Sequence, residues 1–144
     1  MNNKGFTLIE LLITILLLAV ILSIAVTGVI QALNASRNGE YKVLMNNIAT
    51  GSKMFYEECE YGSLVGYKVC NDNKNVDGSY SIKISDLVNY GLLTANKDNK
   101  IINPVNNKNI GECSISITYK DKKYTITSGG NDILDLNNKI ECGD

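Results

Sequence analysis

Glu10 stands at the start of a long apolar stretch and is the residue with the clearest chemical implication. The twenty residues from Leu11 to Ile30 carry no charge. A carboxylate in apolar surroundings is unfavourable unless a partner compensates for its lost hydration. We therefore expect Glu10 either to extend into the headgroups at a membrane boundary or to pair with a positive charge.

Four cysteines form the second chemically informative set, and none of them belongs to a Cys-x-x-Cys pair. That spacing disfavours a zinc ribbon or a thioredoxin-like redox site. If the apolar segment from Leu11 to Ile30 exports the rest of the chain, the four cysteines that follow it favour two disulfides outside the cell. Four buried reduced thiols are the alternative. Three pairings are possible; we favour Cys59–Cys70 and Cys113–Cys142, because each pair brackets one expected structural unit.

The remaining composition is poorly suited to catalysis. The chain has no histidine, which removes the commonest general base and metal ligand, and we find no nucleophile–base set. Lys and Arg total 14 and Asp and Glu total 15, so no basic excess indicates nucleic acid as a partner. Asn131, Asp132 and Asp135 do not follow the EF-hand spacing and are typical of a solvated acidic turn. We expect no catalytic residues, no metal and no cofactor.

The segment from Leu11 to Ile30 is long enough to cross a bilayer as a helix. Twenty residues span roughly 30 Å, the thickness of the hydrocarbon core. Leu, Ile and Val occupy 14 of these 20 positions, and each favours insertion by roughly 0.3–0.6 kcal/mol. Lys4 is expected to keep the short leader cytoplasmic, so the large C-terminal part faces outward.

An ordinary secretory signal peptide is the alternative for this segment. Such a peptide is cut after small residues, and the stretch from Ala25 to Thr27 offers a tolerable site that would leave Gly28 as the new N-terminus. Glu10 is out of place in the apolar core of such a signal, and the apolar run is long for one. The sequence therefore favours a membrane helix.

The helix is predicted to continue beyond the membrane to about Glu58. Three- and four-residue spacings create one apolar stripe, which we expect to pack on the domain's own sheet. The members of the stripe are Tyr41, Leu44, Met45, Ile48, Ser52 and Phe55. Gly28, Gly39 and Gly51 are expected weak points, each costing up to about 1 kcal/mol relative to alanine.

Alternating polar and apolar residues predict the strands of a small sheet. These strands are Tyr80–Ile84, Cys113–Tyr119 and Tyr124–Thr127, the last two forming a hairpin. A short helix is expected from Ser85, as N-cap, to Gly91, as C-terminal stop. Gly, Asn, Asp and Pro content predicts loops or turns at 60–79, 95–109 and 128–131. The tail 133–142 is expected to be irregular or a short edge strand.

The residues from Lys4 to Glu10, with the sequence KGFTLIE, resemble the cleavage and methylation signal of type IV pilins and of their relatives, the pseudopilins. The signal combines a glycine at the break, a phenylalanine after it and an acid four positions further on. The resemblance covers about the first 30 residues closely and the remainder only in general layout. It implies that prepilin peptidase cuts between Gly5 and Phe6 and methylates the new amino group of Phe6.

The resemblance also supplies a counter-charge for Glu10, namely the Phe6 amine of a neighbouring subunit in a filament. Such a pair sets axial register more reliably than it adds stability, because desolvation offsets much of the Coulomb attraction. Several pilins carry a proline near the middle of this helix, whereas here the region from Val26 to Val29 contains Gly28 instead. Glycine also loosens a helix.

Together these observations predict an α+β, pilin-like fold, in which the second half of one long N-terminal helix packs on a three- or four-stranded antiparallel sheet. We expect residues 1–5 to be a removable leader and residues 6–30 to be a transmembrane and filament-core helix. Residues 31–144 are expected to form an extracellular globular domain that includes the second half of the helix.

The predicted function is that of a structural subunit of a type IV pilus serving motility, adhesion or DNA uptake. Its partners would be copies of itself, other pilins, prepilin peptidase and the assembly platform in the membrane. The subunit would cross the bacterial cytoplasmic membrane once before it joins a filament on the cell surface. Two alternatives are a pseudopilin of a type II secretion or competence system and, from another class, a membrane-anchored monomeric binding domain.

Overall fold

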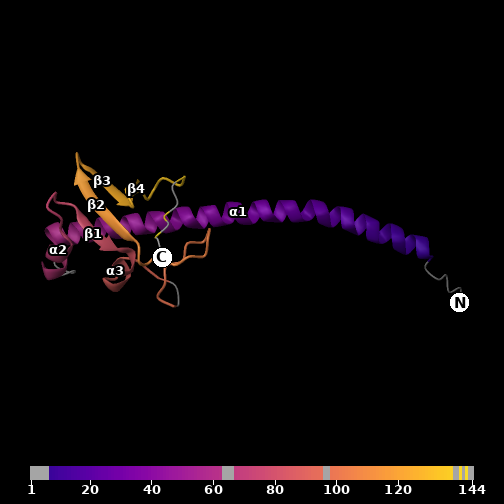
Figure 1. The fold of residues 1–144 in the computed structure, drawn as a ribbon, viewed down its shortest axis with the longest axis horizontal. Coiled ribbons are helices and arrows are strands. Elements are labelled where there is room, and N and C mark those ends of the chain that lie inside the picture. Colours follow the sequence, from indigo (N-terminus) through magenta and orange to yellow (C-terminus); the bar gives the residue numbers. More distant parts are fainter. Residues whose placement is uncertain (1–6, 63–66, 96–97, 138–139, 141, 143–144) are drawn as a thin grey trace. The chain divides into compact units, whose positions relative to one another are not determined.

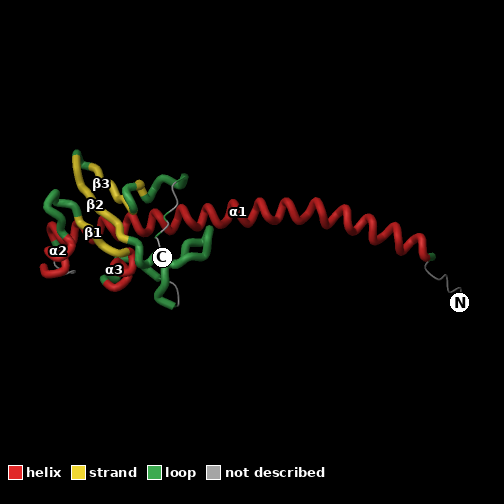
Figure 2. Tube along the Cα trace, in the orientation of Figure 1, coloured by secondary structure: helices red, strands yellow, loops and turns green. Residues whose placement is uncertain are grey.

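The structure, a computed structural model, describes residues 7–62, 67–95, 98–137, 140 and 142. The chain forms two compact units, residues 1–37 and residues 38–144. A single helix, α1 (Leu8–Tyr61), begins in the first unit and ends in the second. Figures 1 and 2 show α1 as one unbroken helix.

The first unit presents an apolar surface along α1. Every Leu, Ile and Val from Leu8 to Leu33 is exposed in the single chain. By length and composition this helix is able to cross a membrane. The hydroxyls of Thr14, Ser23 and Thr27 donate to carbonyl oxygens three residues earlier, at 2.7–2.8 Å. These polar groups are therefore satisfied within the helix, as an apolar environment requires.

In the second unit, α1 buries the predicted stripe. The buried residues of α1 are Tyr41, Met45, Ile48, Ala49, Gly51, Ser52 and Phe55, and Leu44 is half-buried against the same core. The stripe prediction is confirmed, with the small residues Ala49 and Gly51 added to it. The hydroxyl of Ser52 donates to the Ile48 carbonyl at 2.7 Å, which allows a polar side chain to lie in the core.

The sheet of the second unit has four strands in the order β1 (Tyr80–Lys83), β2 (Ser114–Lys120), β3 (Lys123–Ser128) and β4 (Asn131–Asp132). All neighbouring strands are antiparallel. Its inner face carries cross-strand isoleucine pairs, Ile82 with Ile115 and Ile117 with Ile126, and all four side chains are buried. The predicted α+β arrangement of a long N-terminal helix and a small antiparallel sheet is confirmed.

Two tight turns connect β2 to β3 and β3 to β4. Asp121 and Lys122 have φ values of 52° and 62°, and Gly129 and Gly130 have φ values of 57° and 83°. Positive φ at both central residues is what a two-residue type I′ hairpin requires. The first hairpin is therefore tighter than the predicted loop, because Lys120 already pairs with Lys123.

The structure corrects three local predictions between residues 60 and 109. The expected loop 60–79 contains a helix, α2 (Tyr67–Asn73). The short helix α3 (Ile84–Asn89) has Lys83 as its N-cap residue, two residues before the predicted Ser85, and has no side-chain cap, so the N-cap prediction for Ser85 is wrong. Instead the Ser85 N–H donates to the Gly111 carbonyl at 2.8 Å.

The expected surface loop 95–109 is partly internal. Ile101 and Asn103 are buried, and the Ile110 N–H donates to the Ile101 carbonyl at 2.8 Å. The tail also contributes to the core through Ile133 and Ile140. The hydroxyl of buried Tyr41 accepts a hydrogen bond from the Ile140 N–H at 2.8 Å, and this bond fastens the tail to α1.

Candidate functional site

The start of α1 is built around Thr7 and Glu10. Thr7 lies just before the helix, and Glu10 is in its first turn. Oε2 of Glu10 accepts from the Thr7 N–H at 3.0 Å and from the Thr7 hydroxyl at 2.9 Å. In the other direction, the Glu10 N–H donates to the Thr7 hydroxyl oxygen at 3.4 Å. This reciprocal arrangement is a capping box, with Thr7 as N-cap and Glu10 as the third helical residue.

The capping box gives Glu10 a role within its own chain. The box satisfies the N–H groups of Thr7 and Glu10, which have no intrahelical partners at a helix start. A carboxylate there also interacts favourably with the helix dipole, by about 0.3–1 kcal/mol at an exposed site. Glu10 is exposed in the single chain, so its carboxylate remains accessible to a second molecule.

Gly5 and Phe6, the predicted processing residues, lie outside the described residues, which begin at Thr7. The structure therefore brings Glu10 together with Thr7, while the roles assigned to Gly5, Phe6 and Glu10 in processing and assembly stay predictions. Threonine is among the residues favoured at N-caps, so the sequence itself suggests that Thr7 helps to cap the helix start. The signal for its full role was the Thr-x-x-Glu spacing directly before an apolar run.

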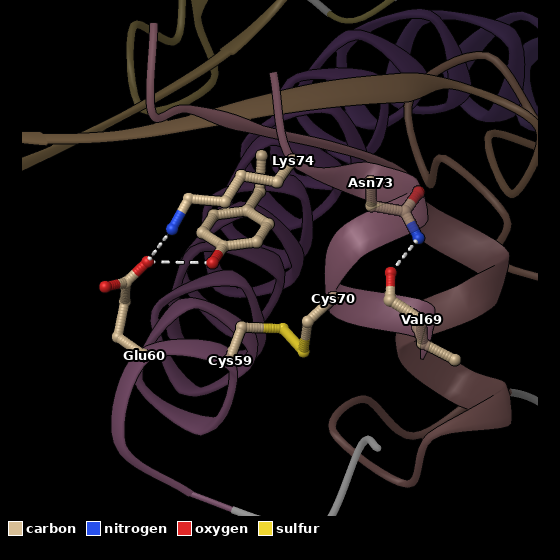
Figure 3. Close-up of a disulfide and its surroundings, with 7 residues drawn as sticks. Cys59, Glu60, Val69, Cys70, Asn73 and Lys74 are labelled. Atoms are coloured by element: carbon tan, nitrogen blue, oxygen red, sulfur yellow. Dashed lines mark hydrogen bonds and ion pairs between the residues drawn. A yellow bond between two sulfur atoms is a disulfide. The ribbon is translucent and has the colours of Figure 1, made fainter. Parts of the chain in front are cut away.

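The cysteines form two disulfides, Cys59–Cys70 and Cys113–Cys142, each with its Cα atoms 5.3 Å apart. This is the pairing that the sequence favoured. The first bond joins the end of α1 to α2 (Figure 3). The second joins the residue before β2 to the C-terminal tail. Both cross-links therefore lie in the second unit; the first fixes the short helix α2, and the second fixes the C-terminal tail.

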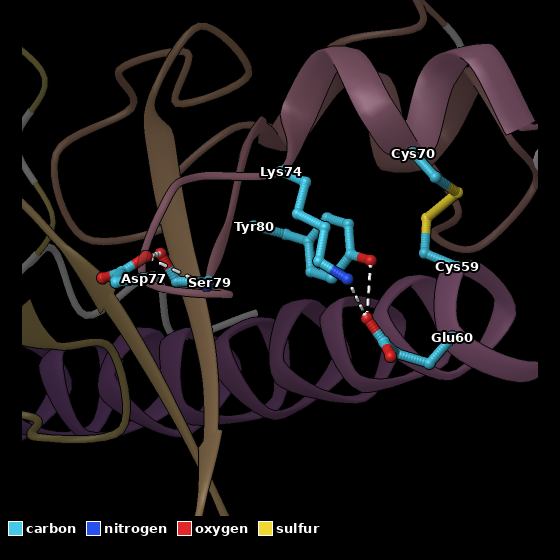
Figure 4. Close-up of polar contacts among 7 residues, drawn as sticks. All are labelled: Cys59, Glu60, Cys70, Lys74, Asp77, Ser79 and Tyr80. Carbon is cyan, nitrogen blue, oxygen red and sulfur yellow. Dashed lines mark hydrogen bonds and ion pairs between the residues drawn. A yellow bond between two sulfur atoms is a disulfide. The ribbon is translucent and has the colours of Figure 1, made fainter.

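A polar cluster accompanies the first disulfide at the end of α1. Oε1 of Glu60 accepts from the Lys74 ammonium at 2.7 Å and from the Tyr80 hydroxyl at 2.8 Å (Figure 4). These two bonds, with Lys74 the larger influence, lower the pKa of Glu60 below its ordinary value. The Lys74 ammonium also lies 5.3 Å from the centre of the Tyr80 ring. The cluster connects α1, the segment after α2 and β1.

Asp132 and Asp135 form local turns. Oδ1 of Asp132 accepts from the Leu134 N–H at 2.9 Å, and Oδ1 of Asp135 accepts from the Asn137 N–H at 3.0 Å. Within the described ranges, no group of three acidic, cysteine or histidine side chains is arranged to hold a metal ion. These contacts are typical of Asx turns, which orient the chain after β4.

Comparison with known protein families gives one match. Residues 1–26 match the family model described as the prokaryotic N-terminal methylation motif. No curated protein and no solved structure matches the chain significantly. The matched segment contains Gly5, Phe6, Thr7 and Glu10, together with most of the exposed apolar part of α1.

Proposed function

Because the chain begins with the class III signal peptide of type IV pilins and pseudopilins, we propose that it is a filament subunit of a type IV pilus. In this proposal prepilin peptidase removes residues 1–5 and methylates the amino group of Phe6. The processed subunit waits in the cytoplasmic membrane and then polymerises into an extracellular filament. No catalytic role for its own side chains is part of the proposal.

The observation that carries the proposal is the combination of the matched motif with the exposed apolar surface of the first unit. Within the part of the chain that the structure describes, the large apolar side chains from Leu8 to Leu33 are all exposed. Leaving them in water is unfavourable by about 25 cal/mol for each Å² of apolar surface. Lipid covers this surface before assembly, and the same surface of other copies covers it afterwards.

The capping box is compatible with the assembly role proposed for Glu10. A carboxylate has about four acceptor sites, and Thr7 occupies two of them through its N–H and its hydroxyl. The cationic amine of Phe6 on a neighbouring subunit therefore binds Glu10 without displacing Thr7. Thr7 holds the carboxylate in one orientation, which favours a defined register between subunits.

Mass spectrometry of the mature N-terminus tests the processing step. The expected result is N-methylphenylalanine at residue 6, with residues 1–5 absent. An N-terminus at Gly28 would instead indicate an ordinary signal peptidase, would remove the apolar half of α1 and would end the filament proposal. An uncleaved chain would favour the membrane-anchored binding domain.

Electron microscopy of sheared surface material, labelled with an antibody to residues 38–144, tests the filament itself. Long labelled fibres are expected for a pilus subunit. Correct N-methylation without surface fibres would instead indicate a pseudopilin, because pseudopilin filaments are short. Labelling confined to the membrane in a strain that does assemble fibres would contradict the subunit role.

A further inference from the structure

A cavity of about 410 Å³ lies in the second unit between the end of α1 and the hairpin of β2 and β3. Its lining residues are Tyr56, Glu57, Glu58, Tyr61, Gly62, Tyr119 and Tyr124. Four of these seven residues are tyrosines and two are glutamates. We call this cavity the tyrosine pocket.

The tyrosine pocket forms where the helix–sheet interface extends beyond the core. Tyr119 of β2 and Tyr124 of β3 are directly paired across the hairpin. They follow the two-residue alternation that points Ile117 and Ile126 into the core, so they belong to the same face of the sheet. Tyr119 nevertheless remains 43% exposed. The inner face of the sheet thus ends in two aromatic rings, of which Tyr124 is partly buried against the core and Tyr119 is exposed.

Aromatic contacts hold three rings in a fixed arrangement. The Tyr119 and Tyr124 ring centres lie 4.6 Å apart. Tyr56 from α1 lies 5.9 Å from Tyr119 and 5.5 Å from Tyr124. The Tyr124 hydroxyl donates to Oε1 of Glu57 at 3.0 Å, and this bond ties the hairpin to α1. The walls of the pocket are therefore positioned before any ligand arrives, which lowers the cost of binding.

The lining has the chemistry of a cation site. Aromatic faces attract ammonium groups through the ring quadrupole, and two glutamates add negative charge at the same cavity. The protein already uses one of these rings in this way, because the Lys53 ammonium lies 5.9 Å from the centre of the Tyr124 ring.

We propose that the tyrosine pocket binds an alkylammonium group, with its methyl or methylene groups against the rings of Tyr56, Tyr119 and Tyr124 and its charge facing Glu57. The ligand class includes quaternary ammonium compounds and lysine side chains. Tyr61, which is 86% exposed at the end of α1, also lines the pocket. The site is confined to residues 38–144 and does not depend on the filament role proposed above.

Titration of the full chain in a non-ionic detergent, followed by NMR of its amides and tyrosine rings, tests the proposal at constant ionic strength. The first probe is choline chloride, and the control is 3,3-dimethylbutan-1-ol, which has the same shape but no charge. Choline is expected to shift the signals of the pocket residues and to bind about tenfold or more tightly than the alcohol. Equal binding of the two would identify an apolar pocket and overturn the proposal.

Matched variants assign the effect to the pocket. Tyr119→Leu removes an aromatic face and is expected to weaken choline binding about tenfold, whereas Tyr119→Phe keeps the ring and the affinity. Glu57→Gln removes the charge but retains an oxygen that accepts from Tyr124, and a loss of several-fold is expected. Glu112→Gln, at the other end of β2, is the control. If Glu112→Gln weakened binding as much as Glu57→Gln, the effect would be general surface charge and the assignment would fail.

A second probe, N-acetyl-lysine N-methylamide, distinguishes the two possible sources of the alkylammonium group, a lysine side chain and a quaternary ammonium compound. Stronger binding of this probe than of choline would indicate a lysine side chain of a protein partner. Stronger binding of choline would indicate a quaternary ammonium compound. Shifts outside the pocket with either probe, and none within it, would contradict the proposed site.

Discussion

At Gly51, α1 lies close to α3 and to the segment that follows it. A Cβ atom added there would lie 2.6 Å from the main-chain oxygen of Leu92 and 3.7 Å from the Leu87 side chain. Because that oxygen belongs to the backbone, no side-chain rotation removes the clash. The residue that the sequence marked as a weak point of the helix is therefore the one that permits close packing.

We expect Gly51→Ala to lower the stability of the full chain. Alanine improves helix propensity by up to about 1 kcal/mol, but overpacking in a close contact costs about 1–3 kcal/mol. The thermal unfolding midpoint, followed by circular dichroism in detergent, is expected to fall. Gly39→Ala is the matched control in the same helix, because a Cβ there meets nothing within 4 Å. Its midpoint should rise, and a fall of similar size in both variants would contradict the role of the Leu92 contact.

The pKa of Glu60 predicts a pH dependence at the same end of α1. The hydrogen bonds from Lys74 and Tyr80 lower the pKa of Glu60 from its ordinary value of 4.5. A lowered folded-state pKa contributes stability that is present above the unfolded value and is lost as the pH falls through the folded value. Urea unfolding from pH 7 to pH 2.5 should therefore show a smaller loss of stability in Glu60→Gln than in the unchanged chain. Identical pH profiles would show that the cluster contributes nothing.

At the scale of the elements, the Cys59–Cys70 disulfide joins α2 to α1. A helix of seven residues is too short to be stable alone, and this bond fixes it to the end of α1. The double variant Cys59→Ser, Cys70→Ser is expected to lose about 3 kcal/mol of stability in the chain-entropy model. It should also lose hydrogen-exchange protection in α2.

The Cys113→Ser, Cys142→Ser variant provides the comparison for that experiment. It removes a cross-link from the tail and leaves the α1–α2 connection intact. Overall stability should fall by a similar amount, but protection within α2 should persist under native conditions. Equal loss of α2 protection in both variants would mean that α2 depends on the whole domain rather than on its own disulfide.

The elements that sequence patterns predicted are those whose periodicity determines their burial. The stripe on α1 and the alternation in β2 and β3 each repeat over several residues, and one buried face follows directly from each. Gly91 adopts a φ of 72° just after α3, as expected for a residue that ends a helix. In these cases the local residue pattern was sufficient to predict the element.

Elements that depend on tertiary partners were missed. α2 is joined to α1 by a disulfide, and β4 has only two residues, whose pairing with β3 defines it as a strand. Asn103 is buried in a segment rich in Asn and Lys, where composition favours a surface loop. The capping box was only partly recognised, because Glu10 drew attention as a charge in an apolar segment rather than as a partner of Thr7.

At the scale of the whole molecule, the two units differ in where their apolar side chains lie. Residues 38–144 contain a core of their own, closed by two disulfides. Residues 8–33 expose their apolar side chains, and such a surface is unfavourable in water. A change at the start of α1 should thus affect assembly and leave the folding of the second unit unaltered.

Glu10→Ala is the variant that tests this separation. Because Glu10 follows the predicted cleavage point by several residues and supplies the proposed intersubunit carboxylate, we expect normal removal of residues 1–5 but lost or strongly slowed filament assembly. Mass spectrometry of membranes measures processing, and the yield of sheared filaments measures assembly. Glu112→Ala, which removes an exposed carboxylate that pairs with Lys83 in the second unit, is the control and should assemble normally. An unchanged filament yield from Glu10→Ala would exclude the register role, because a bundle of apolar helices that assembles without the carboxylate does not need its counter-charge.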